Sequence, residues 1–177
     1  MIQVIVLNGG SSSGKTTIAA CLQDILPSSW LHFGVDMLLD AMPQALLTSE
    51  TGIASGADGS VRPGPAFRQL ESAWMQGIAA MARAGARIIL DEVFLSGVDA
   101  RDRWRAALTD IAVLWVGVRC DSAVATERER SRGDRIAGMA ASQAQMVHSG
   151  IAYDLEVDTS ETSAVECARR IAQMVDD

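Results

Sequence analysis

Short apolar runs alternate along this chain with longer segments in which apolar residues recur every three or four positions. The run at residues 2–7 predicts a buried strand, and the segment 14–26 that follows predicts a helix, which Pro27 ends. The same alternation continues, with further strands predicted at 30–35, 87–92, 111–118 and 153–158 and further helices at 65–84, 100–108 and 163–175. In the helix at 65–84 the stripe expected to face the core consists of Phe67, Leu70, Trp74, Ile78 and Met81. This order predicts a three-layer α/β/α fold around a mostly parallel five-stranded sheet, since continuous apolar runs suit parallel strands covered on both faces.

One long connection lacks such a pattern. Residues 48–64 are rich in Gly, Ser and Ala, and a connection of this length in a compact domain is typical of a lid, a binding loop or a disordered segment. It follows the second strand and precedes the next long helix. We therefore predict a substrate-facing loop over about residues 43–65, with a floppy surface insertion as the alternative.

The composition is that of one globular domain. A chain of 177 residues, 49% hydrophobic and 21% charged, can bury a sizeable core, so we take residues 1–177 as a single domain. A net charge of −7 argues against a surface that binds nucleic acid or an anionic membrane. The first residues lack a basic flank and a cleavage site, and their apolar run is too short to cross a bilayer, so we expect a cytoplasmic protein. The oligomeric state stays open, a homo-oligomer included.

The most specific chemical signal lies between the first strand and the first helix. The sequence there is Gly, four residues, Gly-Lys-Thr, a phosphate-binding loop in the strand–loop–helix context that the motif requires. Its backbone N–H groups can turn toward a polyphosphate, and the helix N-terminus adds partial positive charge. Lys15, the only lysine of the chain, is expected to reach the β and γ phosphates, and the Thr16 hydroxyl to bind Mg²⁺. The alternative is a turn that binds nothing. The predicted cofactor-binding residues are Gly9, Gly10, Ser11, Ser12, Ser13, Gly14, Lys15, Thr16 and Thr17.

Two aspartates stand where predicted strands end, the edge at which an open α/β sheet binds its ligands. Asp36 follows the second strand, and we predict a catalytic role for it, with a helix N-cap as the alternative. The residue three positions later is leucine, which leaves no capping box. Asp91, followed by Glu92, resembles the second acidic motif of phosphate-loop enzymes, where an aspartate holds Mg²⁺, often through water. His32 is expected to be a packed or surface residue without a catalytic role, and His148 to be structural.

Four arginines are interleaved with glutamate and aspartate in a segment beyond the fourth strand. Such interleaving is typical of a solvated, salt-bridged helix face. The alternative is a lid, over about residues 128–140, whose guanidinium groups neutralise a transferring phosphoryl group. We assign Arg132 and Arg135 to this lid, and Arg128 and Arg130 mostly to the surface.

Other phosphate-loop proteins are poor matches. Guanine-specific switch proteins carry an Asn-Lys-x-Asp motif, which is absent because Lys15 is the only lysine, and the Asp-x-x-Gly switch is missing after the third strand. The length leaves no room for the extra domains of oligomeric motor ATPases. A compact kinase that acts on a small hydroxyl compound agrees better with the length, the charge and the arginine-bearing lid.

The chain resembles chloramphenicol phosphotransferase in stretches that span nearly its whole length. They are residues 7–15, 33–36, 82–89, 114–121, 132–135 and 153–159, and the likeness is weakest at 48–63. The resemblance implies a fold similar to adenylate and shikimate kinases. It also implies transfer of the γ-phosphate of ATP to the primary (3-) hydroxyl of chloramphenicol, which inactivates the antibiotic. ATP and Mg²⁺ would be the cofactors, and a chloramphenicol-like small molecule the substrate.

The resemblance also implies roles for single residues. The catalytic set would be Asp36, Lys15, Arg132 and Arg135, and the Mg²⁺ ligands Thr16 and, through water, Asp91. Asp36 would be the base that faces the substrate hydroxyl, and the two arginines would belong to the lid. Thr16 stands where the family can have serine, which is equivalent for Mg²⁺. Asp91-Glu92 replaces an expected pair of aspartates, which leaves the role of Glu92 open.

Two alternatives remain. A kinase of another small alcohol, such as a shikimate- or gluconate-like metabolite, would want polar or basic residues around Asp36. The local sequence instead offers Val35, Met37, Leu38, Leu39 and Met42, which suit an aromatic, neutral compound. The other alternative is a nucleotide-dependent module that resembles zeta-type toxins and binds a protein partner.

Overall fold

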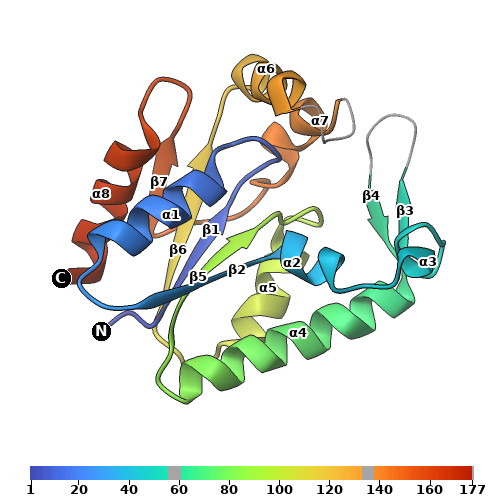
Figure 1. The fold of residues 1–177 in the computed structure, drawn as a ribbon, viewed down its shortest axis with the longest axis horizontal. Helices are drawn as coiled ribbons and strands as arrows, with labels where there is room; N and C mark the ends of the chain where they lie inside the picture. The colour runs from blue at the N-terminus through green and yellow to red at the C-terminus, as the bar shows by residue number, and fades with distance from the viewer. Residues whose placement is uncertain (56–60, 133–137, 177) are drawn as a thin grey trace.

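The computed structural model describes residues 1–55, 61–132 and 138–176 and joins the predicted strands in one parallel sheet (Figure 1). Among these residues the sheet has five strands in the order β2–β5–β1–β6–β7, which are Trp30–Gly34, Arg87–Glu92, Val4–Asn8, Val113–Arg119 and Leu155–Asp158. Each neighbouring pair is parallel, and Val4 of β1 lies opposite Ile88 of β5 and Val113 of β6. The α/β fold predicted from the sequence is confirmed.

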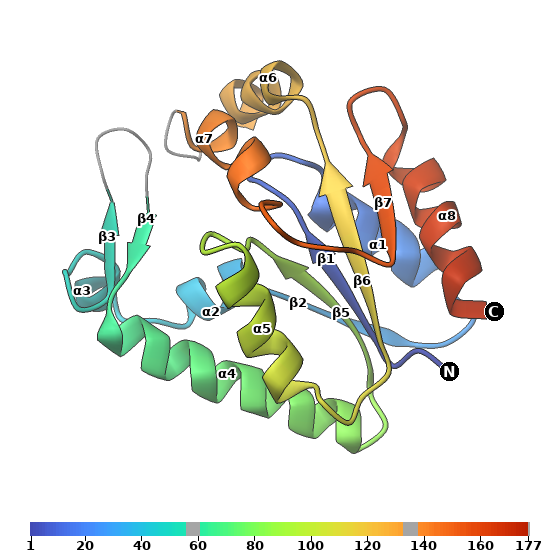
Figure 2. The ribbon, with the colours of Figure 1, turned by 180° about the vertical axis from the view of Figure 1, so that it is seen from behind.

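Helices cover both faces of the sheet. Helices α1 (Lys15–Ile25) and α8 (Ala164–Asp176) pack on one face, and α4 (Pro65–Arg83) and α5 (Val98–Ala107) on the other (Figures 1 and 2). The central strand β1 shows why its apolar run is continuous. Its side chains alternate, with Ile5 and Leu7 in the core under α1 and α8, and Val4 and Val6 in the core under α4 and α5.

Helix α4 has the predicted length and largely the predicted buried face. Phe67 and Ile78 are buried, and Trp74 and Met81 are partly buried against the core, as the stripe predicted. Leu70, predicted to be buried, is 40% exposed, so that part of the prediction is wrong. The helix also buries Met75, Ala79 and Ala82, which the stripe did not include.

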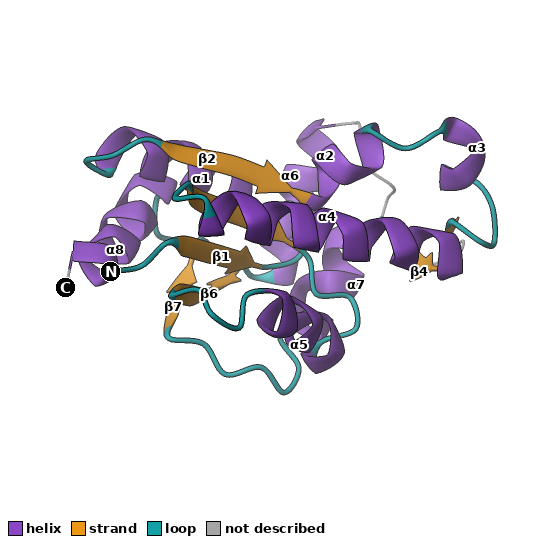
Figure 3. Cartoon of the chain, turned by 90° about the horizontal axis from the view of Figure 1, so that it is seen from below, coloured by secondary structure: helices purple, strands orange, loops and turns teal. Residues whose placement is uncertain are grey.

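The predicted loop at 43–65 has regular structure along much of its length. After α2 (Val35–Asp40), it contains α3 (Gln44–Leu47) and a hairpin of β3 (Ile53–Ser55) and β4 (Val61–Pro63). This hairpin lies at the N-terminal end of α4, away from the main sheet (Figures 1 and 3). A small apolar cluster of Leu38, Met42 and Phe67 anchors it. Strands of only three residues are too short to show a periodic pattern, so they could not be predicted.

Helices α6 (Ser122–Arg132) and α7 (Met139–Met146) lie beyond the carboxyl ends of the strands, beside the phosphate-binding loop (Figures 1 and 2). The buried Glu129 carboxylate joins them, since it accepts hydrogen bonds from the backbone N–H groups of Gly138 (2.9 Å) and Ala140 (2.8 Å). Of the lid predicted over about residues 128–140, residues 133–137 lie outside the described residues, Arg135 among them. None of the helices in the described part of the chain has the length and apolarity needed to cross a bilayer.

Candidate active site

The predicted site residues border one cavity of about 760 Å³ at the carboxyl edge of the sheet. Lys15, Thr16, Asp36 and Asp91 all line it, although they come from α1, α2 and β5. Of the predicted phosphate-binding loop, the residues from Ser11 to Thr17 line the cavity. Strand ends and helix starts meet at this edge in a parallel sheet, so the sequence order alone places these side chains together.

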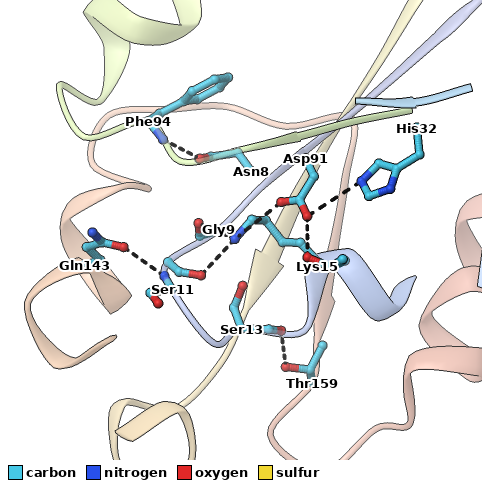
Figure 4. Close-up of polar contacts among 12 residues, drawn as sticks. Asn8, Gly9, Ser11, Ser13, Lys15, His32, Asp91, Phe94, Gln143 and Thr159 are labelled. Carbon is cyan, nitrogen blue, oxygen red and sulfur yellow. Dashed lines mark hydrogen bonds and ion pairs between the residues drawn. The ribbon is translucent and has the colours of Figure 1, made fainter. Parts of the chain in front are cut away.

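The phosphate-binding loop wraps around the side chain of its lysine (Figure 4). Gly14 has the left-handed backbone (φ 89°) that turns the chain into α1, a conformation that glycine adopts without strain. The Nζ of Lys15 donates hydrogen bonds of 2.9 Å to the backbone oxygens of Gly9 and Gly10. A side chain at Gly9 would lie 2.6 Å from the backbone oxygen of Val118, so this turn requires glycine.

The loop is suited to a polyphosphate. The Oγ atoms of Ser11, Ser12 and Ser13 are buried and have no hydrogen-bond partner among the described residues. Hydroxyl groups in this position can donate to phosphate oxygens, as can the backbone N–H groups at the start of α1. With the Lys15 ammonium beside them, these donors match the anionic tail of a nucleoside triphosphate.

A candidate Mg²⁺ position lies between Thr16 and Asp91. The Thr16 Oγ1 donates a hydrogen bond of 2.6 Å to Asp91 Oδ2, and the Lys15 Nζ lies 3.7 Å from Asp91 Oδ1. Burial raises the pKa of Asp91, but the positive charge of Lys15, the nearby His32 ring and a hydrogen bond from Thr16 outweigh it and lower the pKa below its usual value. The described residues contain no cluster of three or more His, Cys, Asp or Glu side chains, so Mg²⁺ here would need phosphate and water oxygens as well.

Asp36 is the second residue of α2 and lines the cavity. The N-cap of α2 is Gly34, which makes no side-chain cap, so the helix-cap interpretation of Asp36 is wrong. In the first turn its negative charge still interacts favourably with the helix dipole. His32, on the neighbouring β2, was predicted to be a packed or surface residue; its Nε2 lies 3.8 Å from Asp91 Oδ2, and it lines the same cavity.

Two of the four arginines beyond β6 differ in their environment. Arg128, predicted to be mostly on the surface, is half-buried and donates to the Thr159 hydroxyl (3.1 Å) and backbone oxygen (2.7 Å), so that prediction is wrong. The Thr159 hydroxyl in turn donates to the backbone oxygen of Ser13 (2.8 Å), which ties α6 to the phosphate-binding loop. Arg130 is 73% exposed, as predicted. Arg132 ends α6, but its side chain, like Arg135, lies outside the described residues.

Helix α7 supports the phosphate-binding loop through residues that the sequence analysis missed. The Gln143 Oε1 accepts a hydrogen bond of 2.8 Å from the Ser11 backbone N–H.

Asn8, at the end of β1, donates to the Val147 backbone oxygen (2.8 Å) and to the Tyr153 hydroxyl (2.6 Å), and accepts from the Phe94 N–H (2.9 Å). Asn8 also stands where a predicted strand ends, as Asp36 and Asp91 do, so its position in the sequence could have identified it as a site residue.

His148 has a partner that its neighbourhood in the sequence did not indicate. Its Nδ1 lies 2.8 Å from the Tyr153 hydroxyl, and the ring is 5% exposed. Burial, and then the charge of Arg119, lower the pKa of His148 to about 4. The imidazole is therefore neutral at physiological pH, which suits a structural role.

Polar side chains from two helices line the rest of the cavity, in contrast to the apolar residues next to Asp36. The Glu71 carboxylate of α4 lies 2.8 Å from the Arg68 Nη1 and 3.3 Å from the Arg103 Nε of α5. Glu92 is buried below them, and burial together with the charges of Asp91 and Glu71 raises its pKa to about 8. Glu92 is therefore largely protonated at neutral pH and differs from the neighbouring, ionised Asp91.

Comparison with known proteins gives one family and one fold. The family model described as chloramphenicol phosphotransferase-like protein matches residues 2–176. A Mycobacterium tuberculosis protein named "Putative O-phosphotransferase Rv2636" is 32% identical over 183 positions, which cover 96% of this chain and 80% of that protein. The tunicamycin resistance protein of Deinococcus radiodurans has a TM-score of 0.70 at 19% identity, with 99% of this chain and 96% of that one covered. The APS kinase CysC of M. tuberculosis, solved with AMPPNP and APS, has a TM-score of 0.66 at 15% identity, with 99% and 98% covered.

Proposed function

The chain belongs to the chloramphenicol phosphotransferase-like family, and we propose that it transfers the γ-phosphate of ATP to the primary (3-) hydroxyl of chloramphenicol, which inactivates the antibiotic. One observation carries this proposal. One cavity joins a phosphate-binding loop, whose serine hydroxyls have no hydrogen-bond partner among the described residues, to a Thr16–Asp91 pair and to the carboxylate of Asp36. A donor site for phosphate and a base for a hydroxyl are the two components that this reaction needs.

Each group of site residues has its own role in this reaction. Lys15 and the loop N–H groups bind and orient the β and γ phosphates, and Thr16 and Asp91 would hold Mg²⁺. Bound Mg²⁺ offsets the negative charge on the phosphate oxygens. Asp36 aligns the acceptor hydroxyl and takes its proton, late in a loose transition state, so orientation matters more than basicity.

The lid arginines remain part of the proposal. Arg132 and Arg135 would neutralise the charge of the transferring phosphoryl group, as their place in the family motif suggests. Arg132 ends α6, and Arg135 lies outside the described residues. The use of ATP agrees with a cytoplasmic protein, and the net charge of −7 with the lack of a nucleic-acid or membrane partner.

A second candidate is a kinase of another small hydroxyl compound with a polar or anionic end. The charged group of Arg68, Glu71 and Arg103 in the cavity favours it, because a purely apolar acceptor would leave these side chains without a ligand group.

A substrate screen tests the proposal. ATP consumption is measured with chloramphenicol, shikimate, gluconate and an aminoglycoside, and each product is identified by its mass. We expect Mg²⁺-dependent turnover with chloramphenicol, and none in a Lys15→Met variant. Turnover with another alcohol but not with chloramphenicol would reject the antibiotic as substrate and retain the kinase, whereas no turnover with any acceptor would count against both.

A further inference from the structure

The cavity has a wall of charged side chains that the proposed phosphate transfer does not use. Arg68 and Glu71 on α4 and Arg103 on α5 all line it, and we call these three residues the arginine cluster. Phe67, Met75 and Phe94 line the same cavity and are buried. A pocket of this kind, apolar with a few converging polar groups, is typical of a small-molecule site.

The arginine cluster carries one excess positive charge. Glu71 is its only acid, and it lies between two guanidinium groups, 2.8 Å from the Arg68 Nη1 and 3.3 Å from the Arg103 Nε. All three side chains are mostly buried, with exposed fractions of 32% for Arg68, 17% for Glu71 and 34% for Arg103. Because partial burial lowers the effective dielectric constant, this excess charge disfavours a cationic acceptor and favours one that brings electron-rich oxygens.

Arg103 has hydrogen-bond donors to spare. Its Nη1 donates to the Asp99 backbone oxygen (3.1 Å) and its Nη2 makes only a long contact with the Ser96 hydroxyl (3.5 Å). Its Nε is buried and makes no hydrogen bond within the described residues; the approach to Glu71 is an ion pair without hydrogen-bond geometry. A guanidinium has five N–H donors in a planar fork, and such a fork suits a planar group with two acceptor oxygens.

A purely structural role of the arginine cluster explains these contacts less completely. Arg68 and Glu71 form an ordinary pair three residues apart on one helix, and Arg103 could simply link α5 to α4. A structural link would, however, be expected to bring the buried Nε into hydrogen-bond geometry, because a buried donor without a hydrogen bond is destabilising. Arg103 also lines the cavity that contains the candidate base, Asp36.

We propose that Arg103, supported by Glu71 and Arg68, binds a planar two-oxygen group, a nitro or carboxylate group, on the part of the acceptor remote from its reacting hydroxyl. This inference rests on the proposed phosphate transfer and specifies its substrate class. Arg103 donates through its fork, Glu71 holds the fork in orientation, and the apolar residues contact the body of the acceptor. The same cluster rejects aminoglycosides, because their ammonium groups would face two guanidinium groups.

Equilibrium binding tests the subsite without any need for turnover. The probes are 4-nitrobenzyl alcohol, 4-carboxybenzyl alcohol and benzyl alcohol, titrated into the full chain saturated with a non-hydrolysable ATP analogue and Mg²⁺. We expect at least one of the two-oxygen probes to bind tenfold or more tightly than benzyl alcohol, the order of magnitude for one well-placed polar contact. Preference for the nitro probe identifies an antibiotic-like acceptor, and preference for the carboxylate probe an anionic metabolite. Equal binding of the three overturns the subsite.

Variants of Arg103 test whether this residue causes the preference for the two-oxygen probes. Arg103→Met keeps the length of the side chain without its donors, and it should remove the preference while the affinity for the ATP analogue is unchanged. Arg103→Lys keeps the charge without the fork and should restore only part of the preference. The control is Arg105→Met, on the exposed face of α5. A preference that survives in Arg103→Met, or a loss that is equal for all three probes, contradicts the proposal.

Turnover separates this inference from the proposed function. If no acceptor is phosphorylated but the probes discriminate as described, the kinase assignment fails and the subsite stands. If chloramphenicol is phosphorylated and its KM is unchanged by Arg103→Met, the kinase assignment stands and the subsite fails.

Discussion

The hydroxyl of Thr16 donates a hydrogen bond of 2.6 Å to the carboxylate of Asp91, which joins the first turn of α1 to the end of β5 across 75 positions of the sequence. The two residues belong to separate motifs, the phosphate-binding loop and the acidic strand end. Their contact places a hydroxyl and an ionised carboxylate side by side, as a shared Mg²⁺ position requires.

This contact gives the first prediction. Thr16→Val removes the hydroxyl and keeps the shape of the side chain. The increase in ATP affinity that Mg²⁺ produces in the wild type should therefore be reduced. We expect ATP affinity measured with Mg²⁺ to fall on the order of tenfold or more, and affinity without Mg²⁺ to change little. The control is Thr109→Val, whose hydroxyl bonds only to backbone oxygens near the end of α5. Unchanged Mg²⁺ dependence in Thr16→Val would place the ion elsewhere.

Arg128 and Arg130 form a matched pair for the second prediction. Arg128→Ala removes two hydrogen bonds to Thr159, and charged donors of this kind are each worth about 1.5–3 kcal/mol. Because Arg128 is only half-buried, solvent reduces this sum, and we expect a loss of about 2 kcal/mol or more in the free energy of unfolding, measured by urea titration, together with weaker ATP binding. Arg130→Ala should stay within about 0.5 kcal/mol of the wild type, because its side chain is 73% exposed. Similar losses in the two variants would contradict this assignment.

The candidate site residues that could be predicted are those that stand where predicted strands end. Asp36 and Asp91 follow apolar runs in the sequence, and a parallel sheet gathers the ends of such runs at one edge. The phosphate-binding loop carries its own local signal. These parts need only the order of the elements and not their packing, so the sequence alone could predict them.

The site residues that could not be predicted depend on how the helices pack against the rest of the protein. Arg128 has the same sequence surroundings as Arg130, and only the docking of α6 against Thr159 distinguishes them. Arg68 and Glu71 read as an ordinary surface pair until α5 brings Arg103 beside them. The spacing of 68, 71 and 75 does place these residues on one side of α4, next to the core stripe, but whether that side faces solvent or a cavity is decided by tertiary structure.

The hydrogen bonds of Asn8 lead to a third prediction. Asn8→Leu would remove the partner of the Phe94 N–H and of the Val147 carbonyl, and one of the two partners of the Tyr153 hydroxyl, which also contacts the His148 Nδ1. Since each unsatisfied buried group costs about 1–3 kcal/mol, we expect the free energy of unfolding to fall by about 2 kcal/mol or more. Tyr153→Phe removes one of these partners and should cost about 1 kcal/mol. Denaturant titration measures both, and an equal effect would mean that Asn8 does not link the three segments.

His148 predicts a pH dependence of stability. Its folded-state pKa of about 4 lies below the ordinary value of 6.5, so between these two pH values the unfolded chain binds a proton that the folded chain does not. Stability that is fully present above pH 6.5 is therefore lost as the pH falls toward 4. Melting temperatures measured from pH 7 to pH 4.5 should fall less steeply in His148→Gln than in the wild type. Parallel curves would show that His148 titrates normally in the folded protein.

The most direct test of the account is the turnover of Asp36→Asn. The substitution keeps size and polarity and removes the charge and the capacity to take a proton, and Asp40→Asn, at the other end of α2, is the matched control. With the acceptor that the substrate screen identifies, we predict that Asp36→Asn lowers kcat by about 10²–10⁴-fold, the range for a positioned base, while ATP affinity and the Asp40→Asn variant match the wild type. Wild-type turnover in Asp36→Asn would contradict the account, because the hydroxyl proton would then leave through another group.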